Sequence, residues 1–194
     1  MKNLINNLGT MYAGMPNNFN LLLDSELKEI RQIIIDKYLD LPCNVSFEYG
    51  NSELDNFEYV KNTYKTQNIL LISADNNSSE LLPNNLNLWF RAWHDYIHIE
   101  NNYLFGFEGE FYAFLKHIEN QSDLFKQVCF SEIVLQTAYF ETFNKFAEFQ
   151  KVVLLPVNRI NELIEEIKVA LRTQMRFGGM RNVGLSSKKV RVYA

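Results

Sequence analysis

Two histidines placed one helical turn apart are the residues of this sequence best suited to chemistry. His94 and His98 lie in the segment RAWHDYIHI, and His117 is the other histidine of the chain. On a helix, residues four apart share a face with their Cβ atoms roughly 5–6 Å apart, which lets two imidazoles bind one divalent ion. We therefore predict that His94 and His98 bind a divalent metal, with zinc or manganese as the best-suited ions.

Two glutamates are candidates to complete the metal site. Glu110 follows the histidines in the segment FGFEGE, and Glu132 lies in the strongly apolar segment VCFSEIVLQTAYF. A buried carboxylate is costly unless a cation or hydrogen-bond donors meet it, or unless it takes a proton and its pKa rises. We expect the metal, Arg91 or a raised pKa to compensate Glu132, and we predict that Glu110 or Glu132 is a metal ligand.

Three further side chains are predicted to take part in catalysis. Asp95, between the two histidines, would bind the metal or activate its water, and Arg91 would neutralise a substrate phosphate or orient a carboxylate. Gln136 follows the buried glutamate by one helical turn. His117 is not included, because a spacing of seven residues places it about 10 Å from Glu110 along a helix axis.

A helix must hold the histidine pair in place. Between residues 86 and 99 the apolar residues recur at helical spacing, while polar residues gather on another face. The apolar stripe consists of Leu86, Trp89, Phe90, Trp93 and Ile97. The polar face consists of Arg91, His94, Asp95 and His98. We therefore expect one face of this helix to pack and the other to carry the site.

The N-terminal part of the chain predicts one helix and a few strands. Residues 1–20 are rich in asparagine and are predicted to be irregular. An amphipathic helix is expected from Asp24 or Ser25 to the residues before Pro42. Segments 45–49, 57–60 and 68–74 contain alternating or β-branched apolar residues, which indicate two or three strands.

The C-terminal part predicts further helices. Gly106 and Gly109 end the histidine helix and bend the chain back, and a helix resumes at Glu110. A long helix is expected from a Ser122 cap to residue 150, and another from residue 158 to a glycine pair. The predicted fold is α+β and mainly helical, with short N-terminal strands followed by a bundle of about four helices.

Length and composition are those of a folded domain. The chain has 194 residues, of which 47% are hydrophobic and 14% aromatic, enough to bury a core without a disulfide or a metal. Cys43 and Cys129 are expected to be free thiols, which excludes a cysteine zinc cage. With no apolar run long enough for a membrane span, we expect a cytoplasmic location. Residues 1–175 would form one domain and residues 176–194 a basic tail.

The C-terminal segment is strongly basic. The net charge of the chain is −4, but residues 168–194 contain seven lysines and arginines and no acidic residue. Such a segment can contact nucleic acid or another acidic partner, or can be a solvated surface. Its apolar residues also indicate that part of it docks or forms a strand. The sequence leaves these alternatives open.

Residues around the histidines are similar to two known enzyme patterns. H-D-x-x-H resembles the H-E-x-x-H of zinc peptidases, with Asp95 in place of the glutamate that activates water. H-D-x-x-H at 94–98, followed by FG at 105–106 and GE at 109–110, resembles HD-superfamily deoxynucleoside triphosphate triphosphohydrolases. The second resemblance implies a His–Asp pair that binds a divalent metal.

A longer pattern covers residues 91–156. The chain contains, in order, R-x-x-H-D at 91–95, H at 98, G-E at 109–110, E-x-x-x-Q at 132–136, Q-K at 150–151 and L-L-P at 154–156. This order resembles a group of uncharacterised tailed-bacteriophage proteins. The resemblance implies a phage origin and names no reaction.

Together these observations predict a metal-dependent hydrolase, phage-encoded and acting in the host cytoplasm on a small phosphorylated or nucleotide-like substrate. The alternative is a non-enzymatic phage accessory or virion-associated protein. In that alternative the histidines, glutamates and Arg91 form a buried structural network, and the basic tail contacts a partner. The metal content of the purified protein separates the two hypotheses.

Overall fold

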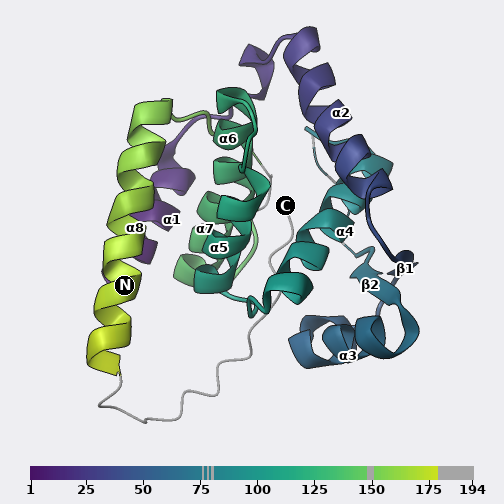
Figure 1. Ribbon diagram of the computed structural model, residues 1–194. Helices are drawn as coiled ribbons and strands as arrows, with labels where there is room; N and C mark the ends of the chain where they lie inside the picture. The colour runs from purple at the N-terminus through teal and green to yellow at the C-terminus, as the bar shows by residue number, and fades with distance from the viewer. Residues whose placement is uncertain (76, 78, 80, 148–150, 179–194) are drawn as a thin grey trace.

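Helices dominate the fold, and one small sheet lies at one side of the molecule (Figure 1). The computed structural model describes residues 1–75, 77, 79, 81–147 and 151–178. The α-helices are α1 Lys2–Gly14, α2 Asp24–Leu39, α3 Phe57–Gln67, α4 Asn84–Asn101, α5 Phe107–His117, α6 Asp123–Cys129, α7 Gln136–Phe143 and α8 Val157–Gly178. The strands are β1 Asn44–Glu48 and β2 Ile69–Ser73, the 3₁₀ turns are η1 Phe19–Leu21 and η2 Ser52–Asp55, and a π-helical segment, η3, spans Phe130–Leu135. The predicted mainly helical α+β class is confirmed, although two helices precede the strands.

The sheet is a parallel pair with α3 as its crossover. Asn44 lies beside Ile69 and Glu48 beside Ser73, so the two strands run in the same direction. Parallel neighbours need such a crossover. The strand predicted at residues 57–60 is wrong, because these residues begin α3. The Asn56 side chain accepts hydrogen bonds from the first backbone N–H groups of that helix, which is an N-cap that the alternating pattern did not reveal.

Helix α4 lies between two hydrophobic cores. Phe90, Trp93 and Ile97 belong to the main core, whereas Ala92 and Ile99 belong to a second core around the sheet. Figure 1 shows α4 between α5 and β2. The helix predicted over 86–99 is therefore confirmed, but its polar face is buried as well as its apolar one.

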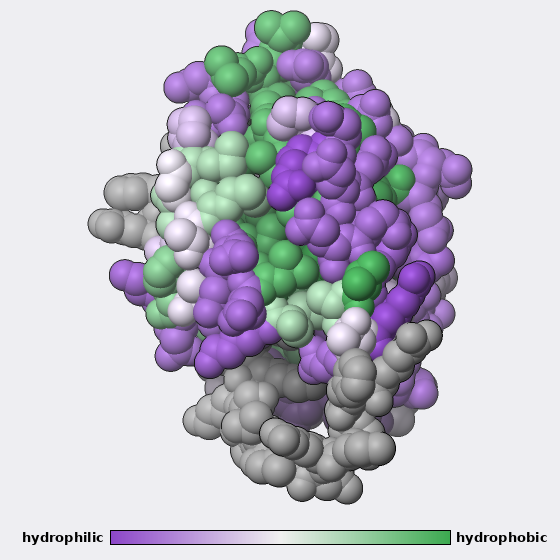
Figure 2. Space-filling view, turned by 90° about the vertical axis from the view of Figure 1, so that its left-hand side faces the viewer, coloured by the Kyte–Doolittle hydropathy of each residue, from purple (hydrophilic) through white to green (hydrophobic). Residues whose placement is uncertain are grey.

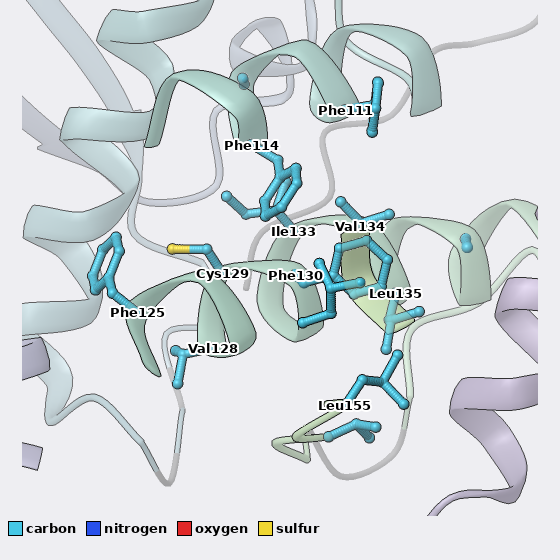
Figure 3. Close-up of a cluster of buried hydrophobic side chains, with 14 of the residues drawn as sticks. Phe111, Phe114, Phe125, Val128, Cys129, Phe130, Ile133, Val134, Leu135 and Leu155 are labelled. Atoms are coloured by element: carbon cyan, nitrogen blue, oxygen red, sulfur yellow. The ribbon is translucent and has the colours of Figure 1, made fainter. Parts of the chain in front are cut away.

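The main core is built where α5 packs on the α6–η3–α7 helix. Figure 3 shows Phe111 and Phe114 of α5 directed toward the side chains of η3, among them Phe130 and Val134. The Ser122 cap of α6 is confirmed, since its hydroxyl accepts from the N–H of Phe125 at 3.2 Å. The predicted continuation to residue 150 is wrong, because α7 ends at a left-handed residue, Asn144 (φ 52°).

Helix α1 corrects the prediction that residues 1–20 are irregular. Its buried residues Leu8, Gly9 and Tyr12 face α7, and a Cβ on Gly9 would lie 2.4 Å from the Thr142 hydroxyl. The Tyr12 hydroxyl accepts from the backbone N–H of Lys151 and donates to its carbonyl, both at 3.1 Å. The asparagines of this segment indicated a loop, although its apolar residues have helical spacing.

Helix α8 closes the other side of the main core. Figure 2 shows the side of the molecule that carries α8, where apolar residues form a band between polar borders. The helix continues to Gly178, three residues beyond the predicted domain end, and residues 179–194 of the basic tail lie outside the described residues. Within the described chain, every helix is too short or too polar to cross a bilayer.

Candidate metal centre

The structure brings together three of the predicted ligands, His94 and His98 from α4 and Glu110 from the first turn of α5. Nε2 of His94 lies 2.9 Å from Oε2 of Glu110 and 3.1 Å from Nε2 of His98. Nε2 of His98 lies 3.5 Å from the same carboxylate oxygen. Among the described residues, these three form the group of histidine, cysteine and carboxylate side chains with converging ligand atoms.

The spacing of these atoms suits a small divalent ion. A point equidistant from the three atoms lies about 1.8 Å from each in their plane, slightly less than a zinc–ligand bond of about 2.0–2.1 Å. Nε2 of His94, Nε2 of His98 and Oε2 of Glu110 would therefore hold such an ion.

The end of α4 fixes the orientation of His98. Asn102 is left-handed (φ 56°), and the next residue, Tyr103, donates its N–H to the His98 carbonyl at 2.9 Å, which closes the helix. The same turn places the Tyr103 carbonyl 2.9 Å from Nδ1 of His98. A carbonyl can only accept, so Nδ1 carries the proton and Nε2 presents a lone pair to the site.

Two glycines bring Glu110 to the histidines. Gly106 has φ 115°, a conformation open to glycine and strained for other residues, and it forms the N-cap of α5. A Cβ on Gly109 would lie 1.7 Å from the Leu104 carbonyl oxygen, so only glycine lets the loop approach α5 this closely. Gly109 lies inside α5 and does not break it, contrary to the prediction. Its bare backbone instead lets the loop fold onto the first turn of α5.

His117 belongs to the site although the sequence prediction left it out. Its Nε2 lies 3.1 Å from Nδ1 of His94, the nitrogen that faces away from Glu110. Burial, and then the two other imidazoles, hold the pKa of His117 well below its usual value, so it is neutral and can accept from His94. The signal in the sequence was its place on the same stripe of α5 as Glu110. His117 is connected to Glu110 through His94, which contacts both residues, and so it reaches the site without being a ligand itself.

The charge of Glu110 is stabilised by its two histidines. Burial opposes ionisation, but His98 and His94 outweigh it and lower the pKa of Glu110 to about 2. Burial also acts to lower the pKa of His98, and the Glu110 carboxylate together with the Tyr103 carbonyl raises it above its usual value. The carboxylate is thus ionised, and the site favours a positive charge between it and the imidazoles.

Glu132 lies outside this group. It sits in η3, is 3% exposed, and accepts one hydrogen bond, from Nε2 of Gln136 at 2.9 Å. Burial raises its pKa to about 8, with the Gln136 bond acting weakly in the opposite direction. Of the three compensations expected from the sequence, the raised pKa is the one present. Gln136, predicted to take part in catalysis, donates its side-chain hydrogen bond to this carboxyl group.

Arg91 and Asp95 flank the histidines on the buried face of α4. Nη1 of Arg91 donates to the carbonyls of Ser73 at 3.2 Å and Asp75 at 2.7 Å, so it ties α4 to the end of β2. Its expected pairing with Glu132 is absent from the contacts of that carboxyl group among the described residues. Asp95 is buried and lies outside the three-ligand group, but its charge helps to raise the pKa of His98.

Comparisons with known proteins identify no relative of this chain. No protein family model, curated protein or solved structure matches the chain. The resemblances to phage proteins and to HD-superfamily enzymes therefore stay predictions.

Proposed function

We propose that the protein is a metal-dependent hydrolase whose metal is held by His94, His98 and Glu110. The observation that supports it is the convergence of two oriented imidazoles and one ionised carboxylate on a single point. Two histidines and a glutamate are the protein ligands of several catalytic zinc sites, which keep a fourth position for water or substrate. A divalent ion bound there would supply Lewis-acid catalysis and lower the pKa of water.

The residues around the ligands have separate tasks in this proposal. Tyr103, through its carbonyl, and His117, through Nε2, hold the two ligand imidazoles in the required tautomers. Asp95, buried beside them, is the proposed proton acceptor, as the sequence suggested. Arg91 is assigned to holding α4 on β2 and not to the substrate, because its guanidinium donates to backbone carbonyls.

The proposal also includes the class of substrate. A phosphorylated or nucleotide-like substrate is proposed because H-D-x-x-H resembles the HD-superfamily pattern and because the longer pattern resembles phage proteins. Both supports come from the sequence, so the substrate has to be found by assay.

A second candidate function is a non-enzymatic protein with a buried polar network. It is favoured by the low exposure of the site, since the side chains of His94, Glu110 and His98 are 7%, 3% and 0% exposed. Without an ion, a proton on Nε2 of His94 or His98 can supply a hydrogen bond within this group, to the Glu110 carboxylate or to the other imidazole. In that case the protein binds no metal with useful affinity and has no hydrolytic activity.

Metal analysis of the purified, untagged protein tests the proposal. We expect about one zinc or manganese ion per chain, with loss of the ion in His98→Ala and Glu110→Ala and retention in Glu132→Gln. Hydrolysis of a phosphomonoester, a phosphodiester and deoxynucleoside triphosphates, each with and without chelator, then identifies the substrate class. Trace metal in the wild type, with no rise in melting temperature on adding zinc or manganese, would overturn the proposal in favour of the structural network.

A further inference from the structure

A cavity of about 760 Å³ lies where α4 ends, α5 begins and α7 ends. Its volume falls within the range of about 300–1,000 Å³ that is usual for small-molecule sites. In Figure 1 the turn from α4 to α5 lies at the lower end of both helices. Residues 101–109 form most of the wall, and none of the three metal ligands lines it. The cavity is therefore a separate feature from the metal centre.

The wall combines aromatic rings with carboxylates. Tyr103 and Tyr112 contribute rings 5.5 Å apart, and α7 contributes Phe140. The charged lining residues are Glu108 and Glu141, and no lysine, arginine or histidine is among the lining residues. Two carboxylates without a basic counterpart repel a phosphate or carboxylate ligand and attract a cation.

The helix ends around the cavity act in the same direction. Helices α4 and α7 both present their C-termini, capped by the left-handed residues Asn102 and Asn144, and the carbonyl end of a helix favours positive charge. The N-terminus of α5 acts in the opposite direction, but Glu108 already lies in its first turn. At the edge, outside the lining residues, the ammonium of Lys61 donates to the Asn102 side chain, and its positive charge acts against the carboxylates.

We propose that this cavity binds an organic cation, a protonated amine or guanidine carried on an aromatic or apolar body. The charged group lies against Glu108 and Glu141, and the body packs on Tyr103, Tyr112 and Phe140. A cation near such rings gains a further attraction from their π faces. The proposal does not depend on the metal centre, because the cavity and its charges are present without an ion.

Three probes that share a phenol ring test the charge preference. Tyramine, 4-ethylphenol and 4-hydroxyphenylacetate carry an ammonium, a neutral group and a carboxylate on similar chains. Each is titrated into the full-length protein in the presence of chelator, and the backbone amide resonances are followed by NMR. We expect tyramine to shift the amides of residues 102–109 and to bind at least about tenfold more tightly than 4-ethylphenol, with 4-hydroxyphenylacetate the weakest.

Variants locate the binding site. Glu108→Gln and Glu141→Gln change exposed residues, so both should fold, and each should weaken tyramine binding about three- to tenfold. Glu58→Gln, an exposed change on α3, is the control and should leave binding unchanged. Equal affinities for the three probes, shifts confined to other residues, or tyramine binding that both cavity variants leave unchanged would overturn the proposal. Preference for 4-hydroxyphenylacetate would overturn it too, and would assign the cavity to an anion at the start of α5.

Discussion

Two buried glutamates in this protein have opposite charge states. Glu110 is 2% exposed and Glu132 is 3% exposed, so burial alone would disfavour ionisation of both. Glu110 has two imidazoles within 3.5 Å and a pKa of about 2, whereas Glu132 has one amide and a pKa of about 8. The comparison shows that the partners, and not the depth of burial, decide which carboxyl group is ionised at neutral pH.

The difference also separates two kinds of function. An ionised carboxylate beside two lone-pair nitrogens can bind a metal, while a carboxyl group that holds its proton cannot do so without first losing it. Both glutamates were candidate ligands in the sequence. The helices that surround them give only Glu110 the surroundings of a ligand.

Removing the histidines should make Glu110 behave like Glu132. In His94→Ala/His98→Ala, the carboxylate loses its partners, and we expect the metal-free unfolding free energy at neutral pH to fall by about 3–5 kcal/mol. Denaturant melts with chelator measure this loss. Adding Glu110→Gln to the double variant should restore part of the stability, because the carboxylate that lost its partners is then replaced by a neutral amide. A triple variant as unstable as the double variant would attribute the loss to packing and would show that an unpaired Glu110 carboxylate is not its cause.

Glu132→Gln should remove a pH dependence of stability. The pKa of Glu132 rises from 4.5 unfolded to about 8 folded, so between these values the folded state binds more protons and stability falls as pH rises. The variant lacks this pH dependence, and at about pH 7 it should be more stable than the wild type by roughly 3 kcal/mol. The advantage should disappear toward about pH 4–5, where both states of the wild type are protonated.

Urea melts of wild type and Glu132→Gln across this pH range measure the effect, with the exposed Glu58→Gln as control. The two proteins should bind zinc with the same affinity, because Glu132 lies outside the ligand group. Equal pH slopes in wild type and variant would show that Glu132 is already ionised in the folded protein.

His117→Phe should weaken metal binding without loss of stability. The phenyl ring keeps the packing against Trp93, whose ring lies 4.0 Å from that of His117, but it cannot accept from Nδ1 of His94. Loss of such an outer hydrogen bond usually lowers metal affinity about 10–100-fold. Competition with a zinc chelator measures it, and Trp93→Phe, which alters the same packing, is the control. An unchanged affinity would show that His117 has no role in orienting His94.

Binding at the metal centre and binding in the cavity should be weakly coupled. Residues 103–109 line the cavity and also carry the Tyr103 carbonyl and the turn before Glu110. Tyramine should order this segment and raise zinc affinity about two- to fivefold, and zinc should raise tyramine affinity by the same factor. Titration of each ligand in the presence of the other measures both factors. Unequal factors, or no change in either affinity, would show that the two sites are independent.

Local patterns predicted the part of the site that depends on one helix. The spacing of His94 and His98 and the apolar stripe of α4 are properties of neighbouring residues, so the sequence was sufficient for them. The approach of Glu110 depends on Gly109 packing against a carbonyl five residues earlier, which no periodicity displays. The role of His117 depends on the second nitrogen of His94, a contact between two helices.

The errors in the fold have similar causes. The first twenty residues were judged by their asparagines, although Leu8 and Tyr12 are spaced to face α7. The segment at 57–60 was too short to distinguish a strand from a helix, and the Asn56 cap decided it. The π-helical turns of η3 keep the apolar content of an α-helix, so composition cannot reveal them.

The contact of Tyr12 with Lys151 sets an order of events during synthesis. The two residues are 139 positions apart, and helix α1 also packs against α7, so α1 leaves the ribosome long before the surface that covers it exists. At about 5–20 residues per second, its apolar face stays without its partner for roughly 7–28 s. Pausing upstream of codon 151 should therefore lengthen the chaperone-bound stage of the nascent chain. Synonymous codon changes between α1 and Lys151 would then alter the yield of folded protein without changing its amino-acid sequence.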